Sequence, residues 1–430
     1  MSRSDHLVAL SFVALIVCGA GPVTAAAVQP PSEAAFDRFT VHLVTMSPGE
    51  EVWERFSHNG VWIKDHATGE DFFFEWGLFD FGQVDFVPRL VRGEMLYRMG
   101  ATSFEGMLVR YGGRRVWADE LALTPAQEAA LVALLVENAR PENRDYIYHY
   151  YLRNCSTRLR DALDAPGVLD GALHRALGGV ETGRSWRWHT LRLLRELPWA
   201  YYGIHLALGQ PTDREIDRWE ETFLPLRLRA AVREMVVSDG AGGERPLVRA
   251  DTLLVAGEAR VPLEKPNRVF SGLVVGLLLG GGFLLVGRWA RTALAGRVVL
   301  GVLGSATALL YGVAGILMPA LWFFTDHDFA ARNEGILQAT PFHLLLVLFL
   351  LPLVAGRRPG ARAVRLSRWL SALALLGLLL KALPPFTQAN LELIVLLLPL
   401  QLGLAGAIAR AALAPAAVAE DEIAESDAPR

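Results

Sequence analysis

Apolar residues are distributed unevenly along the chain. Between residues 36 and 265 they alternate with charged and polar residues in short runs, as in globular domains. After residue 265, charged residues nearly vanish from five apolar segments, which are residues 269–286, 298–324, 340–355, 369–383 and 391–409. A membrane-spanning helix needs about 20 residues, so the third and fourth segments are short. The pattern predicts an all-α domain of about five transmembrane helices over residues 266–413.

The N-terminus has the pattern of a secretory signal peptide. Arg3 precedes an apolar run at residues 7–18, and small residues follow at 24–27. This order matches a charged n-region, a short h-region and a cleavage site. A lipoprotein signal at Cys18 is the alternative, but Leu15, Ile16 and Val17 are not the small residues that precede a lipidated cysteine. We therefore predict a signal peptide over residues 1–27.

Arginines predict the orientation in the membrane. Arg288, Arg291 and Arg297 follow the first apolar segment, and five arginines follow the third, at 357, 358, 362, 365 and 368. The two intervening connections carry only Arg332. The positive-inside rule places the arginine-rich connections in the cytoplasm. The protein is therefore expected in the inner membrane as a multi-pass protein, with residues 36–265 in the periplasm and an acidic tail, residues 414–430, in the cytoplasm.

The region before residue 265 contains signals for both strands and helices. Residues 42–46, 60–64 and 72–76 are β-rich runs, and the turn residues 65–69 join the last two as a hairpin. Thr124, Pro125 and Gln127 have the spacing of a capped helix start, and Asn154 suits the cap of another helix. These signals predict an α+β domain, with helices packed against a small antiparallel sheet.

Composition excludes some functions. The formal net charge is −3, and no basic stripe interleaved with aromatic residues occurs, so no nucleic-acid partner is expected. No C-x-x-C, H-E-x-x-H or G-x-S-x-G pattern is present, so neither a metal, a cofactor nor a serine nucleophile is expected. The connection at residues 325–334 is unusually polar. It is interpreted either as a solvated loop or as a lid that contacts lipid headgroups.

Cys155 is the cysteine that remains if the signal peptide is removed together with Cys18. It follows Asn154, so it should occupy the first turn of a helix, where the partial positive charge of the helix end stabilises a thiolate. Arg158, one turn further on, would add to this field. The alternative is an inert, buried cysteine that acts as a small hydrophobic residue.

A cysteine nucleophile needs a base, and the chain has ten histidines. His58 is the preferred candidate, because it begins a β-rich run beside Gly60, and His149 is the rival. Glu75 on the following run is a candidate to orient the imidazole of His58. A histidine on a sheet edge that faces a cysteine at a helix start is the arrangement of papain-like enzymes.

The chain also resembles a known family. The matching segments are residues 57–61, 74–81, 93–97, 146–150 and, most specifically, Asn154 to Asp161. They are similar to the periplasmic domain of the Lnb-type lipoprotein N-acyltransferases. The resemblance implies a papain-like, circularly permuted NlpC-like fold with the histidine strand before the cysteine helix. It also implies a multi-span domain whose exoplasmic loop contains a Thr-x-His motif, which Thr325 to His327 match.

The sequence and the resemblance together predict a cysteine-dependent acyltransferase of lipoprotein maturation. Cys155 would take an acyl chain from a phospholipid as a thioester and pass it to the N-terminal diacylglyceryl-cysteine of an apolipoprotein. His58 and Glu75 complete the expected catalytic group, and Asn154, Arg158 and His327 are expected to contact substrate. Two alternatives stay open at this point: a membrane-anchored papain-like peptidase or amidase of the cell wall, and a non-catalytic binding or scaffold protein.

Overall fold

The computed structural model describes residues 38–413, except positions 81, 83, 239–242 and 260. The predicted signal peptide, Cys18 and the predicted acidic tail lie outside the described residues. The chain forms two compact units, and each contains two segments. The first unit ends at Glu264 but lacks Arg195–Arg214, which belongs with Lys265 and the following residues in the second unit. The sequence placed a single uninterrupted domain over residues 36–265.

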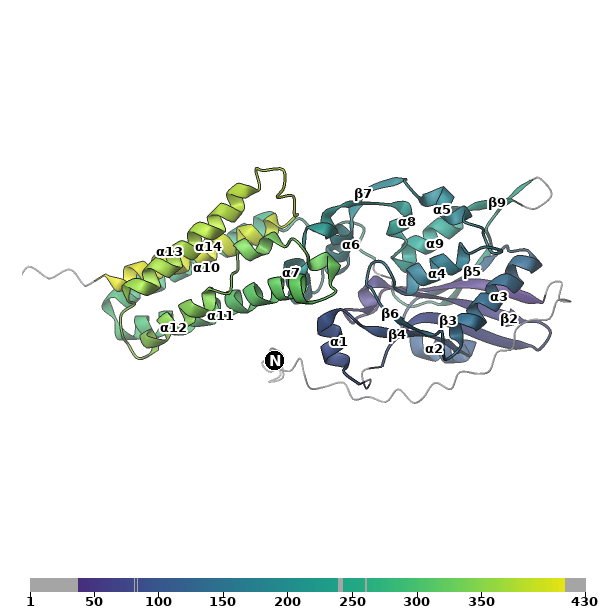
Figure 1. Ribbon diagram of the computed structural model, residues 1–430, viewed down its shortest axis with the longest axis horizontal. Helices are drawn as coiled ribbons and strands as arrows, with labels where there is room; N and C mark the ends of the chain where they lie inside the picture. Colours follow the sequence, from purple (N-terminus) through teal and green to yellow (C-terminus); the bar gives the residue numbers. More distant parts are fainter. Residues whose placement is uncertain (1–37, 81, 83, 239–242, 260, 414–430) are drawn as a thin grey trace, which may run out of the picture. The chain divides into compact units, whose positions relative to one another are not determined.

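The first unit is built on a seven-stranded antiparallel sheet (Figure 1). Its strand order is β11-β5-β1-β2-β3-β4-β6. The strands are β1 (Phe39–Met46), β2 (His58–Asp65), β3 (Glu70–Leu78), β4 (Leu96–Thr102), β5 (Val116–Leu121), β6 (Asp145–Ile147) and β11 (Val248–Val255). The predicted hairpin is confirmed, because β2 and β3 pair antiparallel across the turn that contains Gly69, whose φ is +74°. Left-handed φ values of this kind favour glycine.

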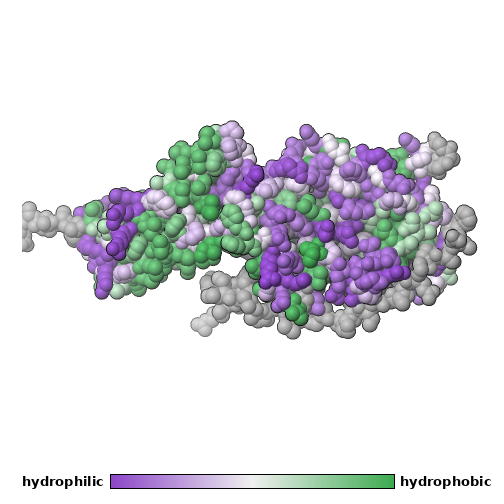
Figure 2. Space-filling view, viewed as in Figure 1, coloured by the Kyte–Doolittle hydropathy of each residue, from purple (hydrophilic) through white to green (hydrophobic). Residues whose placement is uncertain are grey.

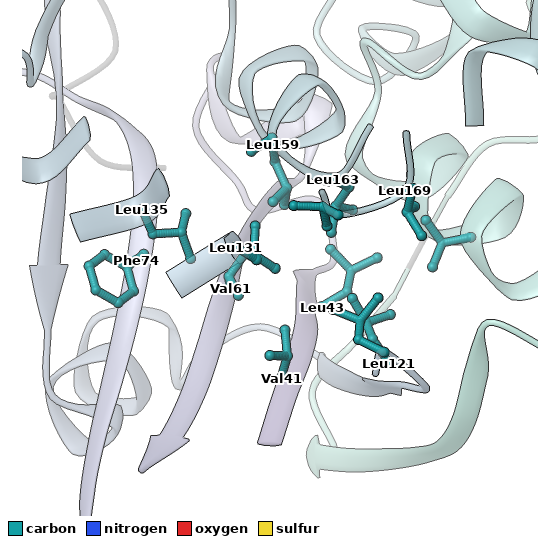
Figure 3. Close-up of a cluster of buried hydrophobic side chains, with 14 of the residues drawn as sticks. Val41, Leu43, Val61, Phe74, Leu121, Leu131, Leu135, Leu159, Leu163 and Leu169 are labelled. Atoms are coloured by element: carbon teal, nitrogen blue, oxygen red, sulfur yellow. The ribbon is translucent and has the colours of Figure 1, made fainter. Parts of the chain in front are cut away.

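Helices cover both faces of this sheet. Alternate side chains of the strands point to opposite faces, so Val41 and Leu43 of β1 face one cluster of buried side chains, and Val44 and Met46 face another. The larger cluster also contains buried side chains from four helices, which are α3 (Pro125–Ala139), α4 (Cys155–Leu163), α5 (Ala172–Leu177) and α9 (Pro225–Glu234). Figure 3 shows part of this cluster. The smaller cluster includes Met107 of α2 (Phe104–Tyr111). The predicted α+β class is confirmed.

Both predicted helix starts have the expected caps. The Thr124 side chain accepts from the Gln127 N–H, and the Gln127 side chain accepts from the Thr124 N–H, which closes a capping box at α3. The short remaining elements of this unit are η1 (Glu54–Phe56), α1 (Phe86–Arg92), β7 (Glu181–Ser185), α6 (Trp186–Leu193), β8 (Glu215–Asp217), α8 (Arg218–Glu221), β9 (Val236–Ser238) and β10 (Glu244–Pro246).

The second unit is helical. Its long helices are α10 (Val269–Thr292), α11 (Leu294–Phe324), α13 (Ala361–Leu380) and α14 (Leu391–Ala412), and each is long and apolar enough to cross a membrane. Figure 2 shows the apolar surface over this helical unit, in contrast to the mainly polar surface of the first unit. Its shorter elements are α7 (Pro198–Ala207), η2 (Gln210–Asp213), η3 (Asp328–Ala330), η4 (Glu334–Leu337) and α12 (His343–Val354).

The predicted number of about five spans needs a correction. Five apolar helices are present among the described residues, but α12 has only 12 residues. Such a helix rises about 18 Å, whereas the hydrocarbon core is roughly 30 Å thick. It begins after Pro341 and ends before Gly356, whose φ is +77°. The next helix is longer than predicted, because α13 extends back to Ala361 and includes three of the arginines assigned to a loop.

A row of glycines allows α10 to pack closely against α14. Gly272, Gly276 and Gly280 recur every four residues, so they share one face of the helix. A Cβ atom on Gly276 would lie 2.6 Å from the carbonyl oxygen of Leu396 on α14. Small residues at such spacing let helix backbones approach each other in membranes. Gly282 lies further along the same helix. A Cβ atom on Gly282 would have no neighbouring atom from another element within 4 Å.

We expect Gly276→Ala to destabilise the helical unit by about 1–3 kcal/mol, because the added methyl group forces two backbones apart. The matched variant Gly282→Ala adds the same methyl group where nothing opposes it. Thermal unfolding of both variants in detergent micelles measures the difference. Equal unfolding temperatures would show that the close contact with α14 contributes nothing to stability.

Residues 195–214 join the second unit through polar contacts. The Tyr201 hydroxyl of α7 donates to Glu392 Oε2 at 2.5 Å, and Lys265 forms an ion pair with the same buried carboxylate. The Asn333 amide donates to the Leu206 carbonyl at 2.7 Å. Glu334, next to Asn333, accepts from Lys381 at 2.6 Å. The segment that follows Thr325 is therefore partly a packing element, and its predicted role as a lid stays a prediction.

Candidate active site

A capped helix start places Cys155. The Asn154 side chain accepts from the Thr157 N–H at 3.0 Å, and the Thr157 hydroxyl accepts from the Asn154 N–H at 2.8 Å. The Asn154 amide also donates to the carbonyls of Tyr150, at 3.0 Å, and Phe223, at 2.9 Å. These bonds fix the first turn of α4, with Cys155 as its first residue. Asn154 is 5% exposed, so its side chain is used to build the helix start.

His58 begins β2 and points toward a carboxylate on β3. Its Nε2 lies 2.8 Å from Glu75 Oε2, and the His58 side chain is 14% exposed. The residue before it, Ser57, has a φ of +71°, a left-handed conformation that costs free energy for a residue other than glycine. With Nε2 bound to Glu75, Nδ1 is the ring nitrogen left for a second partner. The side chain of Cys155 is close by, because Cys155 Cβ and His58 Cε1 both lie within 4 Å of the Cβ position of Gly77.

Gly77 lies where Cys155 and His58 meet. A Cβ atom on Gly77 would be 3.4 Å from Cys155 Cβ and 3.7 Å from His58 Cε1. The register of β3 against β4 shifts between Trp76 and Leu78, and the φ of Gly77 is +100°. A bulge of this kind bends the strand and changes the direction in which the adjacent side chains point. Glycine here gives the bulge its backbone conformation and leaves no side chain beside the thiol and the imidazole.

Replacing Gly77 by alanine is expected to slow alkylation of Cys155 by iodoacetamide about tenfold or more. The φ of +100° strains an alanine backbone, and small displacements of reacting groups have large effects on rate. Gly69→Ala is the control, because Gly69 also has a positive φ but has nothing within 4 Å of its Cβ position. Similar loss of thiol reactivity in the control would mean that the effect follows general destabilisation.

Two residues of α2 hold Glu75 in place. Arg110 donates to Oε1 and the Tyr111 hydroxyl donates to Oε2, each at 2.5 Å. Burial raises the pKa of Glu75, but the hydrogen bonds from His58 and Tyr111 and the charges of His58 and Arg110 outweigh it, so its pKa lies below the usual value. The Tyr111 ring also stacks on His58, with 5.3 Å between ring centroids. Glu75 is thus an ionised, fixed acceptor for His58.

The surroundings of His58 favour its protonated form. Burial lowers its pKa, but the charge of Cys155 and hydrogen bonds with Cys155 and Glu75 raise it to about 9. An imidazolium at neutral pH is the electrostatic partner that a cysteine thiolate requires. A thiol, an imidazolium and an ionised carboxylate are therefore placed side by side at this point of the sheet.

Tyrosines surround the thiol. Burial, and then the charge of Cys155, raise the pKa of Tyr97 to about 12 and raise the pKa values of Tyr146 and Tyr148 well above their usual value. Tyr97 stacks on Tyr148 at 4.1 Å between centroids and lies 5.1 Å from Phe79. These neutral aromatic rings give Cys155 a mostly apolar neighbourhood.

The other sequence candidates lie in different places. Arg158 stacks over Tyr146, with its guanidinium carbon 5.4 Å from the ring centroid. The rival base, His149, accepts with Nδ1 from the backbone N–H groups of Tyr151 and Leu152. His327 belongs to the second unit, directly before η3. The contact of His327 with substrate stays a prediction, as do those of Arg158 and Asn154.

Sequence reasoning missed Arg110 and Tyr111. They lie 35 and 36 residues after Glu75, and no motif connects the three positions. The available signal was indirect, since the helix capped by Ser103 follows β4, the strand paired with the one that carries Glu75. Only the antiparallel pairing brings this helix over Glu75.

Comparison with protein families gives two matches. The Lnb N-terminal periplasmic domain matches residues 30–196, and the Lnb transmembrane domain matches residues 267–413. The two occur in the same order as the resemblance implied, and together they cover well over half of the chain. No curated protein and no solved structure matches the chain.

Proposed function

Because the chain belongs to the Lnb family, with a periplasmic and a transmembrane domain in that order, we propose that it is a lipoprotein N-acyltransferase of the inner membrane. The acyl donor is a membrane phospholipid, and the acceptor is the N-terminal diacylglyceryl-cysteine of an apolipoprotein. The observation that carries this proposal is the placement of His58 between Cys155 and an ionised Glu75. Both substrates are lipids, which accounts for joining such a site to a membrane domain.

In the first half-reaction the Cys155 thiolate attacks the carbonyl carbon of an acyl ester of the phospholipid. The tetrahedral intermediate collapses, the carbon–oxygen ester bond breaks, and the His58 imidazolium protonates the leaving alkoxide. The products are an acyl thioester on Cys155 and a lysophospholipid. Backbone N–H groups at the start of α4 are suited to stabilise the oxyanion of the intermediate.

In the second half-reaction the α-amino group of the acceptor attacks the thioester carbonyl. The carbon–sulfur bond breaks, neutral His58 takes the proton of the amine, and the thiolate–imidazolium pair is restored. Acylation removes the thiolate charge that raises the pKa of His58 in the free enzyme. The same imidazole can therefore act as an acid in the first half-reaction and as a base in the second.

Several features support the finer parts of the proposal. The order of His58 on a strand and Cys155 on a later helix is that of a circularly permuted papain-like enzyme. The apolar rings of Tyr97 and Tyr148 suit an acyl chain next to the thiol. The proposal includes a topology in which residues 1–27 are cleaved, the first unit lies in the periplasm, and the arginine-rich connections lie in the cytoplasm. In this scheme Asn154 positions Cys155 through its caps.

Mass spectrometry of a lipoprotein N-terminus tests the function. We expect a triacylated N-terminus in cells that contain this protein as their only N-acyltransferase, and a diacylated one after deletion of its gene. Complementation with wild-type protein should restore the third acyl chain. An unchanged N-terminus together with altered cell-wall peptides would favour the peptidase alternative.

A further inference from the structure

A pocket of about 190 Å³ lies in the first unit beside the candidate active site. Arg192 and Arg227 supply its charged lining, and leucines and a valine supply most of the rest, among them Leu224 and Leu263. Pockets for drug-sized ligands measure roughly 300–1,000 Å³, so this one suits only part of a larger molecule. Its combination of cations and apolar walls suits a small anionic group attached to an apolar one.

The pocket borders the candidate active site through two neighbouring residues. Ser57, which lines it, directly precedes His58 and has the strained φ of +71°. Leu224, on another wall, directly follows Phe223, whose carbonyl accepts from the Asn154 amide at 2.9 Å. A molecule held here therefore lies next to the segments that position the imidazole and the thiol.

Arg192 is a buried cation with unused hydrogen-bonding capacity. It is 4% exposed, it donates to the Pro262 carbonyl, and its Nη2 lies 3.3 Å from His189 Nδ1. Its Nε has no partner among the residues that the structure describes. Burial, followed by the charges of Arg227 and Arg184, lowers its pKa to about 10, so it stays charged at neutral pH. A buried charge without a close counter-charge is costly unless a ligand supplies one.

The charges around Arg192 do not cancel. Arg184, Arg192 and Arg227 face one shared carboxylate, Glu221, at 3.8 Å from Arg184 and 3.4 Å from Arg227. Glu264 adds a second negative charge near Arg192. His189 contributes none at neutral pH, because burial lowers its pKa to about 4. Among these named groups the arginines outnumber the carboxylates, which favours an anionic ligand.

We propose that this pocket binds the phosphodiester group of the phospholipid donor and so presents the glycerol ester to Cys155. The inference rests on the proposed function. A phosphodiester carries one negative charge, and the planar guanidinium group binds phosphate oxygens through paired N–H groups. The apolar walls contact the glycerol carbons. Leu263, which lines the pocket, is six residues before Val269, the first residue of α10. The chain therefore runs from this wall of the pocket directly into the first membrane-spanning helix.

The test compares two acyl donors on the full-length protein in detergent micelles. One is dioleoylphosphatidylglycerol, and the other is the phosphate-free ester p-nitrophenyl octanoate. Intact-protein mass spectrometry gives the rate at which each acylates Cys155. We expect Arg227→Gln and Arg192→Gln to lower the ratio of the phospholipid rate to the ester rate about tenfold or more, since charge-assisted hydrogen bonds to phosphate oxygens are the strong ones. Arg218→Gln, which removes a surface ion pair with Glu234, is the matched control and should keep the ratio.

Binding without chemistry provides a second measurement. In the Cys155→Ala background, native mass spectrometry should show phosphatidylglycerol retained by the protein and lost on Arg227→Gln, with dioleoylglycerol unaffected. An unchanged rate ratio would overturn the inference, as would equal losses with both donors, which indicate a structural role for the arginines. Equal competition by oleate would show recognition of charge alone and would also overturn it. Failure of both donors to acylate wild-type Cys155 would instead contradict the proposed function.

Discussion

Replacing Cys155 by alanine is expected to abolish the acyl-enzyme and all N-acylation of lipoproteins. In the proposed mechanism the Cys155 thiolate forms the covalent bond to the acyl group. Alanine at this first position of α4 has no nucleophilic atom to replace it. Incubation of wild-type protein with a phospholipid of known acyl chains, without acceptor, should add the mass of one acyl group. Hydroxylamine should remove this mass, as it does for thioesters.

Cys155→Ser is the companion variant. Its hydroxyl group is nearly isosteric with the thiol but far less ionised, so we expect the variant to fold and insert like wild type and to show no turnover. Wild-type turnover by the serine variant would contradict the assignment of Cys155 as nucleophile. An equal mass gain on the alanine variant would place the acyl group on another residue.

Glu75→Gln is expected to slow acylation of Cys155 by about 10²–10⁴-fold, by analogy with the loss of the orienting carboxylate in other triads. The substitution keeps the shape of the side chain but removes the charge that Arg110, Tyr111 and His58 share. It also removes two of the causes that raise the pKa of His58 to about 9. His58 would then lose its proton at a lower pH.

The pH profile separates this role from a purely structural one. The imidazolium is the proton donor of the first half-reaction, so acylation by wild type should fall as the pH rises through about 9. In Glu75→Gln this alkaline limb should move to lower pH. Tyr111→Phe removes one hydrogen bond but keeps the carboxylate and its charge, so the alkaline limb should not move to lower pH in this variant. A lower rate with an unmoved profile would show that Glu75 only supports the fold.

Local signals made part of this structure predictable. Caps such as Asn154 with Thr157 depend on residues three positions apart, so the start of α4 can be recognised from the chain alone. The hairpin at Gly69 is equally local. His58 and Glu75 followed from the same hairpin, because β2 and β3 are adjacent strands. The choice of His58 among ten histidines as the partner of Cys155 followed from its place at the start of a β-rich run beside Gly60, and the resemblance supported it.

Non-local contacts account for what the sequence did not predict. Arg110 and Tyr111 reach Glu75 only because α2 covers β3, and no spacing in the chain encodes that packing. Gly77 was recognisable as a glycine in an aromatic run, but its bulge depends on pairing with β4. The third apolar segment was recognised as short, but hydropathy does not detect that its helix, α12, spans only His343–Val354. The place of residues 195–214 depends on Glu392, almost 200 positions further on.

The position of α7 has a practical consequence for producing the periplasmic part by itself. A fragment that stops at Glu264 keeps α7 but removes Glu392, the acceptor of the Tyr201 hydroxyl, and Asn333, the donor to the Leu206 carbonyl. Tyr201 and His205 are fully buried in the whole chain, and their helix α7 would lose its packing against α11 and α14. Such a fragment would expose an aromatic surface in water and tend to aggregate. A soluble version needs residues 195–214 replaced by a short polar linker between Leu194 and Glu215.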